Sequence, residues 1–200
     1  MKRDISLEYF YNESDIQRGS LLTLDWFGDP LTPFEPALPL DGKKKIVRKK
    51  PEEVSGMHNI PVLPLPYGSA KEIIGRMTGK PVPAGWQGGL PYTYRLEGGP
   101  ALKVRVNVTQ KREIQRVYNV VGTLVGSELP NEWVMAGSHY DAWGFGATDP
   151  NSGTAMLLAL SESLGKLSQA GYKPKRTIKI AHWDAEEQGV IASSEWVEQF

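Results

Sequence analysis

The apolar residues of this chain form compact, regularly spaced runs after residue 115 and looser ones before it. Residues 117–125, 133–136 and 177–183 are short apolar runs of the kind that form buried strands. Residues 152–167 place apolar side chains at helical spacing, and residues 187–200 predict a second helix. This alternation predicts an α/β domain in which helices cover both faces of a mixed sheet.

Residues 1–114 predict a separate region that is rich in loops, because Gly and Pro are concentrated there. The alternation of apolar and polar residues over 102–108 predicts a half-buried strand. Residues 60–65 contain two prolines and predict an edge strand. Residues 21–24 predict a further short strand, and a helix is expected over 70–77.

The composition narrows the possible functions. The 200 residues carry 23 basic and 23 acidic side chains, so no net charge attracts nucleic acid or an anionic membrane. The absence of cysteine excludes cysteine-ligated zinc, thiol nucleophiles and disulfide bonds. The basic run at 43–50 is interpreted as a solvated surface loop, with an anion-binding patch as the alternative. No apolar run is long enough to span a bilayer, and the N-terminus lacks a signal-peptide core.

Side chains with catalytic chemistry follow the predicted strands of the C-terminal part. His139 and Asp141 stand at alternate positions at the end of one strand and therefore point to the same side. Glu186 and Glu187 follow another strand. Because ligands bind outside the carboxyl ends of strands in such sheets, we expect these side chains to meet at one edge. One histidine with several carboxylates is a ligand set that suits Zn²⁺.

Asp149 joins this set from a glycine-rich loop that precedes the predicted helix. Its alternative role is that of a plain helix N-cap, which is common for aspartate. The glutamate pair has an alternative too, because exposed acids are favoured at the start of a helix. A carboxylate shared by two ions about 3.5–4 Å apart is the usual arrangement in two-metal hydrolysis. The set as a whole therefore predicts most of a two-metal hydrolase site.

Short motifs along the chain also carry a family resemblance. They are Q-R-G at 17–19, G-D-P-L-T-P at 28–33, Y-N-V-V-G-T-L at 118–124, H-x-D at 139–141, D-P and S-G within 149–153, R-T-I at 176–178 and W-D-A-E-E at 183–187. With these motifs the sequence resembles the co-catalytic zinc exopeptidases, in the branch of glutamate carboxypeptidase II and the transferrin receptor. The similarity extends over nearly the whole chain and is densest after residue 117.

The resemblance implies a metallo-exopeptidase that hydrolyses terminal peptide bonds with a water activated by two Zn²⁺ ions. His139 would bind one zinc, Asp149 would bridge both ions, and Glu187 would bind the second. Glu186 would act as the general base, and Asp141 would orient His139.

The resemblance implies further sites. Residues 1–114 would be part of a β-rich, protease-associated apical domain, and residues 115–200 part of the zinc peptidase domain. Ser20 stands where the family has a substrate-contacting Asn. A structural Ca²⁺ would be bound near Thr32, Glu35, Glu195 and Glu198.

The resemblance leaves carboxypeptidase and aminopeptidase activity open, and a non-catalytic, receptor-like relative is the alternative to an enzyme. The remaining Asp and His ligands of the family lie downstream, so these 200 residues alone are expected to be an inactive fragment. A peptide is the expected substrate, and nucleic acid is not an expected partner. A homodimer formed through a C-terminal domain and an extracytoplasmic location, whether secreted, periplasmic or membrane-anchored, follow from the resemblance alone.

Overall fold

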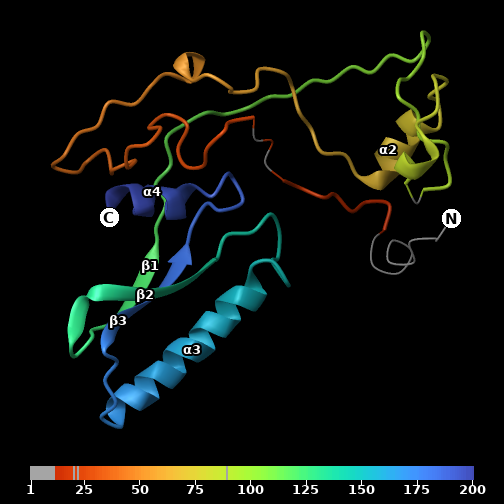
Figure 1. Cartoon of the computed structure of the whole chain (residues 1–200). Coiled ribbons are helices and arrows are strands. Elements are labelled where there is room, and N and C mark those ends of the chain that lie inside the picture. The colour runs from red at the N-terminus through yellow and green to blue at the C-terminus, as the bar shows by residue number, and fades with distance from the viewer. Residues whose placement is uncertain (1–11, 20, 22, 89) are drawn as a thin grey trace. The chain divides into compact units, whose positions relative to one another are not determined.

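The computed structural model describes residues 12–19, 21, 23–88 and 90–200, and the described residues form two compact units (Figure 1). The smaller unit contains residues up to 18 together with 59–111, and the larger one contains 19–58 together with 112–200. Residues 19–58 therefore group with the C-terminal part, although they precede the change of pattern near residue 115. The assignment of residues 1–114 to an apical domain stays a prediction.

The larger unit is built on a three-stranded sheet. Its strands are β1 (Val120–Leu124), β2 (Leu129–His139) and β3 (Arg176–Trp183). β3 lies in the middle, pairing antiparallel with β1 and parallel with β2. The parallel pair needs a long crossover, which α3 (Asn151–Gln169) supplies. The predicted α/β domain with a mixed sheet is thus confirmed.

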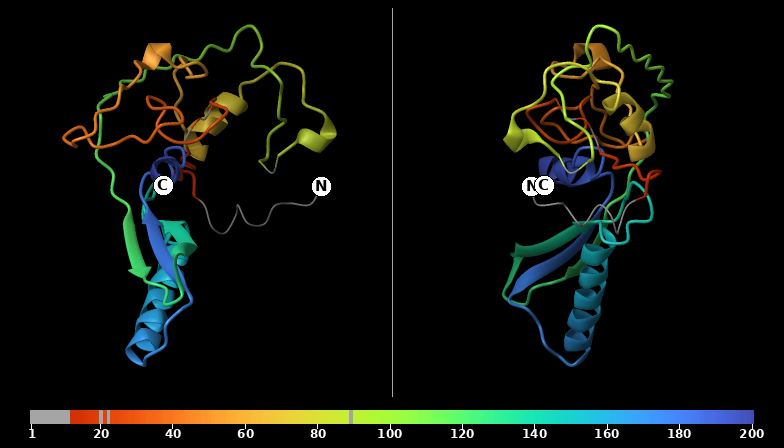
Figure 2. Two further views of the ribbon diagram at one scale, coloured as in Figure 1. Left: turned by 60° about the vertical axis from the view of Figure 1, so that its left-hand side comes forward. Right: turned by 90° about the vertical axis from the view of Figure 1, so that its right-hand side faces the viewer.

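The two helices of this unit, α3 and α4 (Ile191–Gln199), contact opposite faces of the sheet (Figure 2). Alternate residues of a strand point to opposite faces. On one face, Ser138 of β2 lies so close to Gly153 of α3 that any side chain at this glycine would collide with it. On the other face, the ring of Trp196 in α4 lies 5.9 Å from that of Trp133 in β2.

The core of this unit is small and lies between the sheet and the helices. Leu157 of α3 is 1% exposed, and the central strand β3 buries Ile180 and Ala181. Ala192 is the buried residue of α4. Among the described residues, no helix combines the length and the apolar character needed to cross a membrane. The core thus holds together the strand ends on which the candidate site lies.

The smaller unit contains one α-helix, α2 (Tyr67–Ile74), which begins and ends three residues earlier than the predicted helix over 70–77. Its N-cap position is Pro66, whose backbone is extended, as is typical of the residue directly before a helix. The unit also holds the 3₁₀ turn η2 (Ala84–Trp86), and the 3₁₀ turn η1 (Pro51–Glu53) belongs to the larger unit.

Three predicted strands are not strands. All of residues 60–65 and 102–108 are described, and none of them belongs to a strand. Residues 21, 23 and 24 belong to none either, and Leu22 lies outside the described residues. Alternation identifies a face of a strand, but a strand also needs a partner for its backbone groups, and two prolines at 60–65 remove donors for such pairing. These predictions were wrong for that reason.

Candidate metal centre

His139 is the last residue of β2, and its backbone carbonyl and its ring each form a hydrogen bond. Its carbonyl oxygen accepts a hydrogen bond of 2.8 Å from the Thr154 hydroxyl of α3. Its ring Nδ1 lies 3.1 Å from the backbone carbonyl oxygen of Asp141. A carbonyl can only accept, so Nδ1 carries a proton, and in the neutral ring Nε2 is then the nitrogen with the free lone pair. The other ring nitrogen of a metal-binding histidine usually makes such a bond.

Asp149 faces the other ring nitrogen, Nε2. Its Oδ1 lies 2.8 Å from Nε2 of His139, although the Asp149 side chain is 74% exposed. An ionised carboxylate only accepts, so this contact is a hydrogen bond of the protonated ring, which carries N–H at both nitrogens. The N-cap position of α3 is Pro150, and no side chain caps this helix. The alternative interpretation of Asp149 as a plain N-cap is therefore wrong, and its Oδ1 is directed to the histidine ring.

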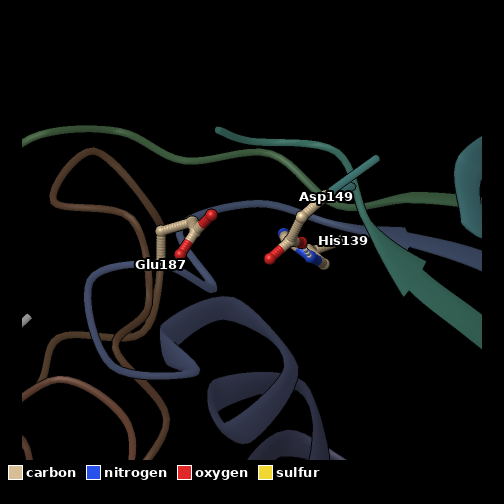
Figure 3. Close-up of side chains that lie close together, drawn as sticks. All are labelled: His139, Asp149 and Glu187. Atoms are coloured by element: carbon tan, nitrogen blue, oxygen red, sulfur yellow. Dashed lines mark ion pairs between the residues drawn. The ribbon is translucent and has the colours of Figure 1, made fainter. Parts of the chain in front are cut away.

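Glu187 completes a cluster with these two residues (Figure 3). One ligand atom from each of His139, Asp149 and Glu187 lies within 4.8 Å of the other two, and the described residues contain no second group of three such side chains. Figure 3 shows the two carboxylates and the imidazole directed toward a common space. The three side chains reach it from the end of β2, from the loop before α3 and from the loop after β3.

Asp141 connects the histidine to the glutamate pair. Its Oδ1 accepts a 3.0 Å hydrogen bond from the backbone N–H of Glu186, and its Oδ2 accepts one of 3.1 Å from the N–H of Glu187. Its Oδ1 also lies 3.5 Å from Nδ1 of His139. One carboxylate thus touches three of the residues that the sequence analysis singled out.

The electrostatics of the cluster favour a bound cation. Burial would lower the pKa of His139, but the charge of Glu186 and the hydrogen bond with Asp149 outweigh it and raise that pKa. Burial, followed by the charges of Asp149 and Glu186, raises the pKa of Glu187. A cation between these groups would relieve the repulsion among the carboxylates. One imidazole and two carboxylates are also donors that Zn²⁺ accepts, so the residues present fit this ion.

The loop that carries Glu186 and Glu187 has an unusual backbone. It joins β3 to α4, and Ala185 and Val190 both adopt positive φ angles, 51° and 55°. Such a conformation costs about 1–3 kcal/mol for a residue other than glycine and is common at functional sites. It also explains why α4 begins at Ile191 and not near Glu187, where the sequence pattern placed the helix start.

Asn119 and Asp184 lie beside this loop, and the sequence analysis assigned a role to neither. Asn119 bonds to the backbone of Asp184 and of Ala192, and the Asp184 carboxylate accepts the N–H of Tyr118. Both residues belong to motifs that carry the family resemblance, which was the available signal. Their bonds to backbone groups are invisible in a sequence.

A second acidic cluster joins α4 to the loop at 28–37. Glu195 accepts the backbone N–H of Asp29 at 2.6 Å through Oε1 and that of Ala37 through Oε2. Burial raises the pKa of both Glu195 and Glu198. Thr32 is 3% exposed, and its hydroxyl oxygen, like Oε2 of Glu198, is buried without a hydrogen-bond partner.

The remaining predicted site residues are not gathered in this way. Glu35 is exposed and forms no three-residue ligand group with Glu195 and Glu198. Ser20 lies outside the described residues. Their assigned roles stay predictions.

A comparison with known proteins matches the part of the chain that contains the cluster around His139. The family model described as "Peptidase family M28" matches residues 119–200, which run from Asn119 through the sheet to the end of the chain. This segment of the chain thus matches the M28 family. The matched segment contains the three residues of the cluster together with Asp141 and Glu186.

Similar proteins extend the similarity to the N-terminal part of the chain. A "Glutamate carboxypeptidase 2 homolog" of Caenorhabditis elegans is 40% identical over 192 residues, which cover 92% of this chain and 24% of the relative. The "Aminopeptidase NAALADL1" of Rattus norvegicus is 39% identical over 196 residues, covering 94% of this chain and 25% of the relative. A "Probable glutamate carboxypeptidase VP8" of Zea mays is 38% identical over 187 residues, covering 93% and 26%. The chain thus spans about a quarter of the length of these relatives.

Proposed function

We propose that the protein to which this chain belongs is a zinc-dependent exopeptidase that hydrolyses terminal peptide bonds. The observation that carries the proposal is the convergence of His139, Asp149 and Glu187 within 4.8 Å, next to a second glutamate. Their donor set suits Zn²⁺, and their positions follow the carboxyl ends of the parallel strands β2 and β3.

In this proposal the cluster holds two zinc ions. His139 would hold one ion, Glu187 would hold the other, and Asp149 would be shared between them. When bound, zinc lowers the pKa of the attacking water and polarises the scissile carbonyl. Asp141 holds the Nδ1 proton of His139 in place through its carbonyl oxygen, so that the lone pair of Nε2 faces the ions.

Glu186 is the proposed general base. Its Oε2 lies 3.8 Å from Nδ1 of His139, so it reaches the cluster, and its side chain is 37% exposed, so water has access to it. Glu186 would take a proton from the water as the water oxygen attacks the carbonyl carbon. It would return that proton to the leaving nitrogen as the C–N bond breaks, which keeps atoms and charges balanced.

The second acidic cluster is proposed to bind a structural Ca²⁺. Buried oxygens without partners on Thr32 and Glu198 support the proposal, because Ca²⁺ binds oxygen ligands of this kind. Glu195 would share its carboxylate between the ion and the backbone amides of the loop at 28–37. Glu35 would approach from the same loop.

Substrate and assembly belong to the proposal as well. Some relatives are named as carboxypeptidases and others as aminopeptidases, so the proposed substrate is a peptide with a free terminus at either end. A homodimer and an extracytoplasmic location are proposed on the family resemblance alone.

The test uses the full-length protein loaded with zinc. Peptides blocked at the N-terminus, at the C-terminus or at both ends are incubated with it, and bound zinc is measured by elemental analysis. We expect hydrolysis of a peptide with one free end, none of the doubly blocked peptide, and about two zinc ions per chain. Glu186→Gln should lower kcat by a factor of about 10²–10⁴ without releasing zinc. Full zinc occupancy without hydrolysis of any peptide would favour a receptor-like protein instead.

A further inference from the structure

We propose that Asn119 is a positioning residue for the glutamate pair, because its side chain ties together the two ends of the loop that carries Glu186 and Glu187. Its Oδ1 accepts the backbone N–H of Asp184 at 3.2 Å, directly after β3. Its Nδ2 donates to the backbone carbonyl of Ala192 at 2.8 Å, in the first turn of α4. The role rests on the proposed function, since it concerns the base and a ligand of that site.

The chemistry of the two partners determines how the amide is oriented. A backbone N–H must meet an oxygen and a backbone carbonyl must meet an N–H group, so the amide cannot be turned over without losing both bonds. Asn119 is half-buried and directly precedes β1, whose first residue pairs with His182 of β3. The side chain thus continues the β1–β3 pairing by one bond beyond the point where the strands end.

The Asp184 side chain in turn bonds to the segment that contains Asn119. Its Oδ2 accepts the N–H of Tyr118 at 3.0 Å, and its Oδ1 accepts the N–H of Ala185 at 2.9 Å. Asn119 and Asp184 thus each accept a backbone N–H of the opposite segment through a side-chain oxygen: Asn119 that of Asp184, and Asp184 that of Tyr118. This reciprocal arrangement leaves the loop little freedom at the end that enters from β3.

The loop needs such ties because its own bonds do not attach it to the sheet. Within the loop, the N–H groups of Gly189 and Val190 donate to the carbonyl of Glu186, and that of Ile191 donates to the carbonyl of Ala185. Gly189 also accepts the N–H of Gly28, and none of these bonds reaches a strand. Ala185 and Val190 hold positive φ angles that relaxation would tend to remove. Asp141 holds the middle of the loop through the amides of Glu186 and Glu187, whereas Asn119 holds both of its ends.

A purely structural role for Asn119 makes a different prediction. If the residue only closed the end of the β1–β3 ladder, its loss would lower the stability of the whole domain and leave each folded, zinc-loaded molecule fully active. If it positions the loop, its loss would move Glu186 relative to the substrate, which affects kcat more than KM. A misplacement of about 1 Å can reduce a rate by a factor of about 10².

The experiment compares Asn119→Ala, Asn119→Asp and Asn131→Ala in the full-length, zinc-loaded protein. Asn131 is an exposed asparagine of β2 and serves as the matched control. Amide hydrogen exchange of residues 184–192 reports on the loop itself, and kcat, KM and zinc content report on the site. We expect Asn119→Ala to speed exchange in the loop at least about tenfold and to lower kcat by a factor of about 10–100, with KM and zinc content little changed.

Asn119→Asp keeps an acceptor for the Asp184 amide and loses the donor to Ala192, so it should give a smaller change of the same kind. This variant decides the question if Asn119→Ala does not fold. Unchanged loop exchange, unchanged kcat per bound zinc, or the same changes in Asn131→Ala would overturn the proposal. If the wild-type protein hydrolyses no peptide, the proposed function fails, while the exchange measurements still decide whether Asn119 holds the loop.

Discussion

The larger unit contains two groups of acidic side chains that differ in the protein groups they contact. The acids around His139 contact the histidine and one another, and Asp149 remains 74% exposed. In contrast, the Glu195 carboxylate accepts hydrogen bonds from backbone amides of the loop at 28–37. Glu198 and Thr32 each bury an oxygen that has no hydrogen-bond partner. The first arrangement leaves a carboxylate exposed to solvent, while the second buries its oxygens against the loop at 28–37. Similar residues thus surround a histidine in one place and hold a loop to a helix in the other.

Replacing His139 should give the largest difference in effect between the two acidic clusters. In the full-length protein, His139→Ala removes the only imidazole of the first cluster, so we expect zinc content to fall and hydrolysis to reach the background rate. The thermal stabilisation by Ca²⁺ should persist, because the second cluster contains none of the altered atoms. Elemental analysis, a hydrolysis assay and thermal unfolding measure these three quantities. His58→Ala, a histidine outside both clusters, is the control, and equal zinc loss there would contradict the assignment.

Asp141 should give the next largest effect. Asn at this position keeps one acceptor oxygen but turns an NH₂ group toward one of the two loop amides, which then lacks its partner. Loss of such a supporting contact typically costs a factor of about 10–100 in metal affinity or activity. Zinc titration and kcat of Asp141→Asn measure it, with the exposed Asp25→Asn as the matched control. An effect confined to the melting temperature would argue that Asp141 only stabilises the fold.

The second cluster should respond to Ca²⁺ and not to zinc. Its raised carboxyl pKa values mean that, without an ion, it favours the folded state below the ordinary glutamate pKa of 4.5 and loses that contribution as the pH rises. Ca²⁺ should therefore raise the melting temperature more at pH 7 than at pH 4.5. An ion at 100 times its Kd stabilises the folded state by about 2.7 kcal/mol.

Two substitutions test this assignment of the second cluster. Thr32→Val and Glu198→Gln should abolish the stabilisation by Ca²⁺, whereas Glu162→Gln, an exposed glutamate of α3, should retain it. Peptide hydrolysis at saturating zinc should survive wherever the protein stays folded. A Ca²⁺ response that is unchanged in both variants would place the ion elsewhere.

The sequence was sufficient to predict the strands and the helix whose apolar residues are regularly spaced. The sheet and α3 were predicted from the spacing of their apolar residues, but the expected burial holds mainly for β3. β1 and β2 are largely exposed, and α3 buries Leu157 alone. The strand expected over 102–108 was wrong, since alternation does not supply a pairing partner. The late start of α4 was not predictable, because nothing in the identities of Ala185 and Val190 signals a positive φ.

The candidate site was predictable in its members but not in its contacts. His139, Asp149 and Glu187 were expected to meet, and the structure brings them together. The sequence left Asp149 with two interpretations, and only its distance to His139 and the uncapped α3 decide between them. The bonds of Asp141 and Asn119 to loop amides were not predicted, because a sequence does not state which backbone group a side chain will meet.

The smallest effect concerns the backbone that separates the two clusters. Ala185→Gly removes the strain of a positive φ, worth about 1–3 kcal/mol, but adds the flexibility of glycine, which costs about 0.5–1 kcal/mol. The free energy of unfolding should therefore stay level or rise by up to about 2.5 kcal/mol, from the difference of these two ranges. Ala192→Gly, in the helical part of the same region, should instead lower it by about 1 kcal/mol. Denaturant unfolding of both variants measures this opposition, and a clear loss of stability in Ala185→Gly would show that the loop is not strained at this residue.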